Sequence, residues 1–260
     1  MKKKFKSCLV LLLFVSSVTG VAAQTHIVAH RGYWDKPGGA ENSIAALQAA
    51  DSIGVYSSEL DVHLTADGRV VVFHDNDVQN PTTGKKMHIE SVRYADLAHV
   101  KLANGEPLPT LENYLAYAAK LKCRLVLEVK KHDTPEAEDR CVDELLRLVR
   151  DADIASRIDY ISFSRRVCDR LHILMPEASV AYLGGDLTPR EVKDRGWSGI
   201  DYHFEILHAH PEWVAQCHSL GLTVNVWTVD HQTDIQRFVT LGVDFLTTNR
   251  PVEAMAEAKR

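Results

Sequence analysis

Short apolar segments with strand-like composition alternate with longer segments of helical periodicity along most of the chain. Runs rich in Val, Ile and aromatic residues are typical of strands, whereas apolar residues repeating every three to four positions indicate helices. The predicted strands are residues 26–30, 58–62, 124–130, 158–163, 180–183, 199–203, 224–229 and 243–248. The predicted helices are residues 43–53, 110–122 and 135–151, with others beginning near Arg165, Thr188, Pro211 and Thr233.

A further apolar segment, residues 69–74, follows the second predicted strand and is expected to return beside it as a hairpin. The eight other strands alternate with helices, which predicts a closed parallel (β/α)8 TIM barrel with right-handed crossovers. The 260 residues suit one such domain, which typically takes about 250. A doubly wound open sheet is the alternative, but the strand count and the charged residues at successive strand ends favour the barrel.

Residues 76–108 interrupt the alternation of strands and helices. Pro81, Gly84, Gly105 and Pro107 punctuate this stretch, and both residue types favour turns over regular elements. We therefore expect a small insertion after the second strand, in the form of an irregular excursion above the barrel.

The first 23 residues have the features of a cleaved secretory signal peptide. Four lysines precede an apolar stretch at residues 9–15, and Ala22 and Ala23 precede Gln24. An uncleaved anchor is the alternative, but the apolar stretch is shorter than the roughly 20 residues that span a bilayer. We expect residues 24–260 to form one secreted or periplasmic domain without stable membrane insertion.

The charge balance narrows the classes of partner. Beyond residue 23 the chain carries 26 basic and 35 acidic residues, so the mature protein is clearly acidic. A negative body repels nucleic acid and anionic membranes, which disfavours a nucleic-acid-binding role. An anionic substrate would have to be attracted by local charges and a bound cation. The sequence leaves the oligomeric state open.

The cysteines do not indicate a structural zinc site, because they are widely spaced and form no CxxC pair. We expect small buried hydrophobic side chains, although an exported location also permits a disulfide whose pairing the sequence does not define. The four cysteines beyond residue 23 are Cys123, Cys141, Cys168 and Cys217.

Three carboxylates lie at predicted strand ends. Glu59 and Asp61 are two residues apart and therefore point to the same face of one strand, while Glu128 ends another strand. At a barrel mouth they would repel one another unless a cation lay between them. Oxygen ligands favour Mg²⁺ or Ca²⁺ over zinc, so we expect one divalent cation. A salt-bridge cluster with Arg31 and Lys130 is the alternative.

Two histidines also end strand-like segments. His30 and His74 are candidates for proton transfer, because imidazole titrates near neutral pH and can act as base or acid. Taken alone, each would more often be structural. His63 shares the predicted face of Glu59 and Asp61 and is expected to support the groups that contact the metal or the substrate.

Two cationic side chains are candidates for binding a phosphate. Arg31 offers a planar fork suited to two phosphate oxygens, and Lys130 offers a point charge that can approach the same group. Gly32 would permit a close backbone approach at the strand end. Glu41 and Asn42 either cap the following helix or orient a ligand.

The residues that suggest this chemistry also carry a family resemblance. From about residue 27 to residue 251, the chain resembles glycerophosphodiester phosphodiesterases, because a series of motifs occurs in the order found in that family. Several separated motifs in register are far more specific than any one of them. The motifs are AHRG, ENS, ELDVHLTADGRVVVFHD, PTLENYL, LEVK, SFS, NVWTVD and GVDFLTTNRP.

The resemblance implies a TIM barrel with a small insertion that hydrolyses glycerophosphodiesters to sn-glycerol 3-phosphate and an alcohol. It implies a divalent cation as cofactor and catalytic roles for His30 and His74, with His30 expected as base and His74 as acid, or the reverse. The attacking hydroxyl belongs either to water or to the glycerol of the substrate. Trp227 would form a wall of the glycerol pocket or pack in the core. Tyr202 and His203 would select substrate or form a plain polar strand end.

The chain departs from the family pattern at two places. Asn80-Pro81-Thr82-Thr83-Gly84 lacks the arginine that often precedes Thr-Thr-Gly, and Thr248-Asn249-Arg250-Pro251 replaces the common Thr-Asp-x-Pro. We expect these changes to affect substrate fit and barrel closure without touching the metal ligands or the proton-transfer groups.

Two other functions fit the same residues. A lysophospholipase D-like enzyme, or one that cleaves another phosphodiester, would use the same site but need an apolar groove beside the mouth. A non-catalytic barrel that only binds phosphodiesters would have lost a metal carboxylate or a histidine, and none is missing.

Overall fold

The structure, a computed structural model, describes residues 24–80 and 83–259. The predicted signal peptide at residues 1–23 and Pro81 lie outside the described residues. The single mature domain from residue 24 to 260 also stays a prediction. Among the helices that the structure does describe, none is long and apolar enough to cross a membrane.

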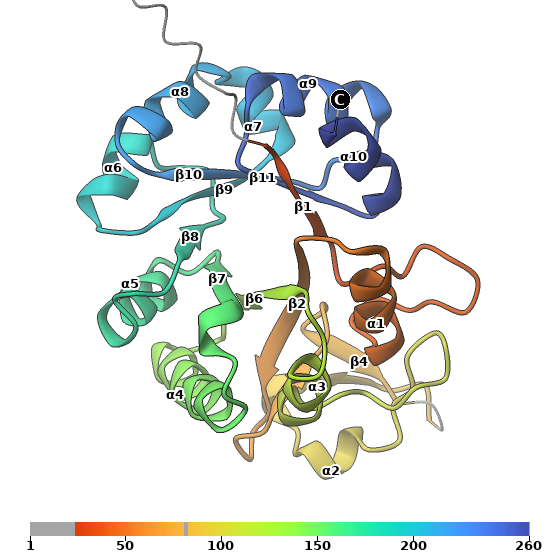
Figure 1. The fold of residues 1–260 in the computed structure, drawn as a ribbon. Helices are drawn as coiled ribbons and strands as arrows, with labels where there is room; N and C mark the ends of the chain where they lie inside the picture. The colour runs from red at the N-terminus through yellow and green to blue at the C-terminus, as the bar shows by residue number, and fades with distance from the viewer. Residues whose placement is uncertain (1–23, 81–82, 260) are drawn as a thin grey trace, which may run out of the picture.

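Eight parallel strands of the described chain form a closed barrel, with helices around the outside (Figure 1). The last strand pairs with the first and the first pairs with the second, which closes the ring. The predicted (β/α)8 TIM barrel is therefore confirmed. The strands are β1 (His26–Ala29), β2 (Ser57–Leu64), β6 (Arg124–Val129), β7 (Ile158–Ser162), β8 (Val180–Tyr182), β9 (Gly199–His203), β10 (Thr223–Trp227) and β11 (Phe245–Thr248).

The predicted hairpin is also present. Strand β3 (Val70–Val72) runs antiparallel to β2, with Val72 opposite Val62 and Val70 opposite Leu64. This pairing returns the chain to the strand end, so that His74 arrives beside the carboxylates of β2 rather than at the end of a barrel strand of its own.

Five of the described α-helices begin at Ser or Thr residues whose side chains accept a backbone N–H of the first turn, as at Ser43, Thr110 and Thr134. The short helix α7 and the last helix α10 were not predicted. The helices outside the insertion are α1 (Ile44–Ile53), α3 (Leu111–Ala118), α4 (Pro135–Asp151), α5 (Arg165–Leu174), α6 (Pro189–Asp194), α7 (Phe204–Ala209), α8 (Glu212–Ser219), α9 (Gln232–Leu241) and α10 (Pro251–Ala258).

The insertion has regular structure of its own, so the expected irregular excursion was wrong. It contains the hairpin β4 (Asp77–Gln79) and β5 (Lys86–His88), the 3-10 helix η1 (Ile89–Ser91) and the helix α2 (Tyr94–Leu97). Apolar side chains from these elements pack with one another and against β3, and this small core stabilises the segment despite its turn-forming residues. In Figure 1 the insertion lies outside the strand ring.

Strand alternation divides the barrel into two apolar regions. Side chains such as Leu60, Leu127 and Ile200 face the helices in the main core, whereas Val28 and Ile161 belong to a smaller cluster inside the barrel. Towards the carboxyl ends of the strands, the interior positions carry polar and charged side chains instead. The four described cysteines are free and buried, consistent with the expected hydrophobic role.

Candidate functional site

A cavity of about 120 Å³ lies at the carboxyl ends of the barrel strands. This is the face of a TIM barrel on which active sites form. Charged side chains make up one part of its lining and apolar side chains another. The lining residues are His30, Arg31, Glu59, His74, Glu128, Lys130, Ile161, Phe163, Leu183, Asp201, Trp227 and Thr247.

The three predicted carboxylates converge beside this cavity. Glu59, Asp61 and Glu128 are all buried, and each offers an oxygen atom within 4.8 Å of those of the other two. The pairing of β2 with β6 places Asp61 directly opposite Glu128, and the alternation along β2 turns Glu59 to the same side. Three buried carboxylates so close together form a group that could hold a metal ion.

Each carboxylate is held in place by a neighbouring donor. The backbone N–H of Arg31 donates to Glu59 Oε2 at 2.8 Å, and Asn42 Nδ2 donates to Asp61 Oδ2 at 2.9 Å. Lys130 Nζ lies 3.2 Å from Asp61 Oδ1 and 2.8 Å from Glu128 Oε1. The salt-bridge arrangement considered from the sequence therefore exists, and its cations face the same cavity as the carboxylates.

The charge balance within the cluster favours an additional cation. Burial, together with repulsion from Asp61, raises the pKa of Glu128 to about 7, and burial with the same repulsion raises that of Glu59 well above its ordinary value. Burial also opposes ionisation of Asp61, but Lys130 and other cationic neighbours hold the pKa of Asp61 below its ordinary value. A hard divalent cation with oxygen ligands fits this set, because it would offset the repulsion.

Glu128→Gln is expected to stabilise the metal-free protein at pH 8 by about 2 kcal/mol, which corresponds to a melting temperature roughly 5 °C higher. The pKa of Glu128 rises from 4.5 to about 7 on folding, so the folded state loses stability as pH increases between these values and carries the full penalty above them. Thermal melts in EDTA at pH 5 and pH 8 measure this difference. The gain should disappear at pH 5.

A matched control for this variant is Glu112→Gln, which removes an exposed carboxylate paired with Arg69 at 3.5 Å. Its melting temperature should change little at either pH. A Glu128→Gln protein less stable than wild type at pH 8 would mean that the ion pair with Lys130 outweighs the repulsion among the carboxylates.

Both histidines line the cavity but have different partners. His30 is held at Nδ1 by Asn249 Oδ1 at 2.9 Å, and burial is the main cause that lowers its pKa. His74 Nδ1 donates to Asp75 Oδ1 at 2.7 Å, and its side chain is 37% exposed. His63 is fully buried, and its Nε2 bonds the backbone carbonyl of His74 at 3.2 Å, so it supports the chain segment that carries His74.

The contact between His30 and Asn249 corrects one expectation from the sequence. The departure from the family motif at Asn249 does touch a proton-transfer candidate, because the loop after β11 ends beside the carboxyl end of β1. Barrel closure brings together two residues that are 219 positions apart. The spacing of the motifs carried no signal of this contact.

Arg31 and its neighbours form a compact turn after β1. Arg31 Nη1 lies 2.6 Å from Glu41 Oε2, so Glu41 orients Arg31, and Asn42 binds Asp61. Neither residue caps α1, because the N-cap is Ser43. Gly32 has a φ of +83°, and a Cβ there would lie 2.7 Å from the Cβ of Ala46, so only glycine fits this turn.

The apolar wall of the cavity includes Trp227. Its ring packs edge-on against Phe163, with ring centroids 5.7 Å apart, and against His203 at 5.2 Å. Its Nε1 donates to the backbone carbonyl of Asp201 at 2.9 Å, which fixes the plane of the indole. Trp227 thus lines the cavity, and His203 lies behind it.

Tyr202 does not line this cavity, in contrast to the role in substrate selection considered from the sequence. Its hydroxyl donates to the carbonyl of Leu187 at 2.8 Å, and its ring is fully buried among the helices, near Trp213. The neighbouring Asp201 faces inward instead. Asp201 is buried, lines the cavity and accepts from Asn225, and burial raises its pKa to about 8. Strand alternation was the available signal for Asp201.

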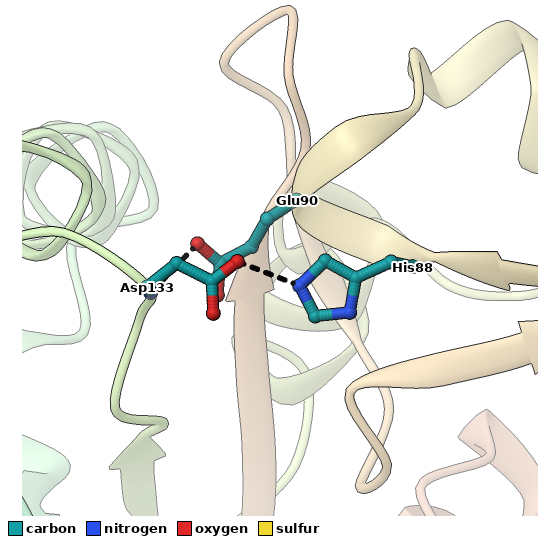
Figure 2. Close-up of side chains that lie close together, drawn as sticks. All are labelled: His88, Glu90 and Asp133. Atoms are coloured by element: carbon teal, nitrogen blue, oxygen red, sulfur yellow. Dashed lines mark hydrogen bonds and ion pairs between the residues drawn. The ribbon is translucent and has the colours of Figure 1, made fainter.

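A second group of candidate metal ligands lies outside the cavity (Figure 2). His88 bonds Asp133 through Nε2 and Asp77 through Nδ1, both at 3.0 Å, and Glu90 accepts the backbone N–H of Asp133 at 3.1 Å. Both ring nitrogens are therefore bonded to carboxylates. The group is an ion-pair clamp that holds the insertion against the loop after β6, next to the strand end that carries Lys130.

A TIM barrel with clustered carboxylates, two histidines and two cationic side chains at its mouth is the arrangement expected of a phosphodiester-cleaving enzyme. The model of the glycerophosphoryl diester phosphodiesterase family matches residues 30–253. The chain belongs to this family, so the resemblance identified from the sequence motifs and the predicted enzyme class are confirmed.

Three proteins illustrate the similarity. A crystal structure of a glycerophosphodiester phosphodiesterase from Parabacteroides distasonis is 46% identical, with a TM-score of 0.87 over 91% of this chain and 98% of that one. A glycerophosphodiester phosphodiesterase from Caldanaerobacter subterraneus is 29% identical over 88% of this chain and 95% of its own length. A phosphodiesterase from Oleispira antarctica, solved with the product sn-glycerol-3-phosphate, shares the fold, with 20% identity over 91% of this chain and 98% of that one and a TM-score of 0.80.

Proposed function

We propose that this protein hydrolyses glycerophosphodiesters to sn-glycerol 3-phosphate and an alcohol, with one Mg²⁺ or Ca²⁺ held by Glu59, Asp61 and Glu128. The observation that carries the proposal is the convergence of three carboxylates, two cationic side chains and two histidines around one cavity. The names of the similar proteins support the substrate class, and the Oleispira antarctica complex supports the product.

In this proposal, the cationic side chains bind the phosphate. Arg31 and Lys130 line the cavity and are held by carboxylate partners, so their charges are already positioned before substrate arrives. When bound, the cation supplies a Lewis acid that polarises the phosphoryl group and lowers the pKa of a nearby hydroxyl. The attacking hydroxyl comes from water or from the substrate glycerol.

The apolar wall binds the glycerol side of the substrate and limits the entry of water. Phe163, Leu183 and Trp227 line the same cavity as the charged side chains. Burial raises the pKa of Asp201 to about 8, so its carboxyl group is mostly neutral near pH 7. It can then donate a hydrogen bond to the bound substrate or accept one from it. His30 and His74 then transfer protons to or from the oxygens that attack and leave.

The protein is proposed to act after export, in the periplasm or outside the cell. The support is the signal-like composition of residues 1–23. Deacylated phospholipids are the expected substrates, with choline, ethanolamine or glycerol as the leaving alcohol. The acidic body of the mature protein would give no help in binding nucleic acid.

Purified mature protein is expected to release sn-glycerol 3-phosphate from glycerophosphocholine or glycerophosphoethanolamine, to lose this activity in EDTA, and to regain it with Mg²⁺ or Ca²⁺. A coupled assay for glycerol 3-phosphate measures the release. Lysophosphatidylcholine is the comparison substrate, because a lysophospholipase D would prefer its acyl chain. No release from any glycerophosphodiester with either metal would contradict the proposal.

A further inference from the structure

A chain of hydrogen bonds at the barrel rim ends at His30. Asn249 Oδ1 lies 2.9 Å from His30 Nδ1, and Asn249 Nδ2 donates to Asp230 Oδ2 at 2.8 Å. Asp230 lies in the loop after β10, Asn249 in the loop after β11, and His30 at the end of β1. Three neighbouring segments of the barrel rim are therefore linked by one side-chain relay.

The carboxylate of Asp230 fixes which way the amide of Asn249 points. Its Oδ1 accepts the backbone N–H of Asn249 at 2.8 Å and the hydroxyl of Thr248 at 3.0 Å, and its Oδ2 accepts the Asn249 amide. An ionised carboxylate only accepts hydrogen bonds, so the amide nitrogen must face Asp230. The opposite orientation would set two acceptors against each other.

The amide orientation in turn fixes the proton on the imidazole. Because Asn249 presents its oxygen to His30, Nδ1 of His30 must donate, and the neutral ring carries its proton on Nδ1. Nε2 then has a free lone pair. A neutral imidazole with an unprotonated Nε2 is the form that accepts a proton from an attacking hydroxyl.

We propose that Asp230 and Asn249 are positioning residues that fix the Nδ1-protonated tautomer of His30 and so make His30 the general base of the reaction. This rests on the proposed glycerophosphodiester hydrolysis for its catalytic meaning. His74 is then left as the acid, and the bond from its Nδ1 to the carboxylate of Asp75 holds its ring in place.

The surroundings of His30 agree with a neutral ring. Burial lowers its pKa, and the adjacent Arg31 lowers it further, whereas the bond to Asn249 and the charges of Asp61 and Glu41 act in the opposite direction. The net effect is a lower pKa. Asn249, an uncharged acceptor, holds the ring without the negative charge that a carboxylate would bring.

The departure at Asn249 therefore has a chemical consequence. Where the family commonly has Asp in this motif, a carboxylate would face His30 and favour its protonated form. In this chain, the carboxylate stands one step away, on Asp230. The double variant Asp230→Asn with Asn249→Asp exchanges the two groups with a minimal change of shape, and so tests the charge of the direct partner.

Two measurements test the proposal. Histidine ¹⁵N NMR of the metal-free protein, with His30 assigned from a His30→Gln difference spectrum, is expected to show Nδ1 protonated and Nε2 unprotonated. Asn249→Ala should lose this preference and lower kcat on the order of 10²-fold with little change in KM. The double variant should keep the tautomer and move the acidic limb of the kcat/KM profile upward by about one pH unit.

The control is Asn113→Ala, an exposed asparagine on α3 that should leave the spectrum and the kinetics unchanged. A wild-type spectrum with the proton on Nε2 of His30 would overturn the proposal, as would an unchanged tautomer and kcat in Asn249→Ala. A folded wild-type protein that releases no glycerol 3-phosphate would instead contradict the proposed function, while the spectrum still decides the tautomer.

Discussion

Asp61→Asn is expected to lower turnover of glycerophosphocholine by about 10³-fold or more and to weaken Mg²⁺ or Ca²⁺ binding by at least tenfold. Asp61 is the central anion of the cluster: it lies 3.2 Å from Lys130 Nζ and 3.6 Å from Arg31 Nε, and accepts from Asn42. Removing its charge takes away one proposed metal ligand and also loosens Arg31 and Lys130, the side chains proposed to bind the phosphate. Steady-state kinetics and calorimetric titration of the metal-free variant measure the two effects.

A matched control is Asp159→Asn. This aspartate lies near the start of β7, at the opposite end of the barrel, and pairs with Arg124 at 3.0 Å. The control should keep activity and metal affinity within about threefold of wild type. If Asp61→Asn retained activity within tenfold of wild type, the carboxylate cluster would be a structural ion-pair network rather than a metal site.

The barrel was predictable because its physical cause is local. Each parallel strand is buried on both faces and each helix on one, so strand and helix each leave their own apolar period in the sequence. The insertion was harder to predict, because its small core is assembled from scattered apolar residues such as Val78, Ile89 and Leu97. Six-residue α7 is too short to show a period.

Placement of the site residues was predictable to the extent that strand alternation determines it. Glu59 and Asp61 share a face because they are two apart, and the same rule separates Tyr202, which faces the helices, from Asp201, which faces the cavity. The relay through Asn249 was not predictable, because it crosses the closure of the barrel. Which side chains meet there depends on the register of β11 with β1.

His30→Ala and His74→Ala are each expected to lower turnover of glycerophosphocholine by about 10³-fold. On a substrate with a good leaving group, however, the two variants should differ in how much turnover they lose. If His74 is the acid, its loss should matter little for glycerol 3-phosphate p-nitrophenyl ester, because p-nitrophenolate departs without a proton. If His30 is the base, its loss should lower turnover to the same extent with either substrate. Release of p-nitrophenol and of choline measures the comparison.

The exposed His210→Ala provides the control, since His210 pairs with Glu212 on the surface and stacks on Trp213, away from the cavity. The reverse pattern, with His30→Ala rescued by the activated substrate and His74→Ala still impaired, would assign the acid to His30. That result would conflict with the neutral, Nδ1-protonated ring proposed for His30, because an acid acting through Nε2 must start as an imidazolium with protons on both nitrogens. The two experiments thus constrain the same atom from independent directions.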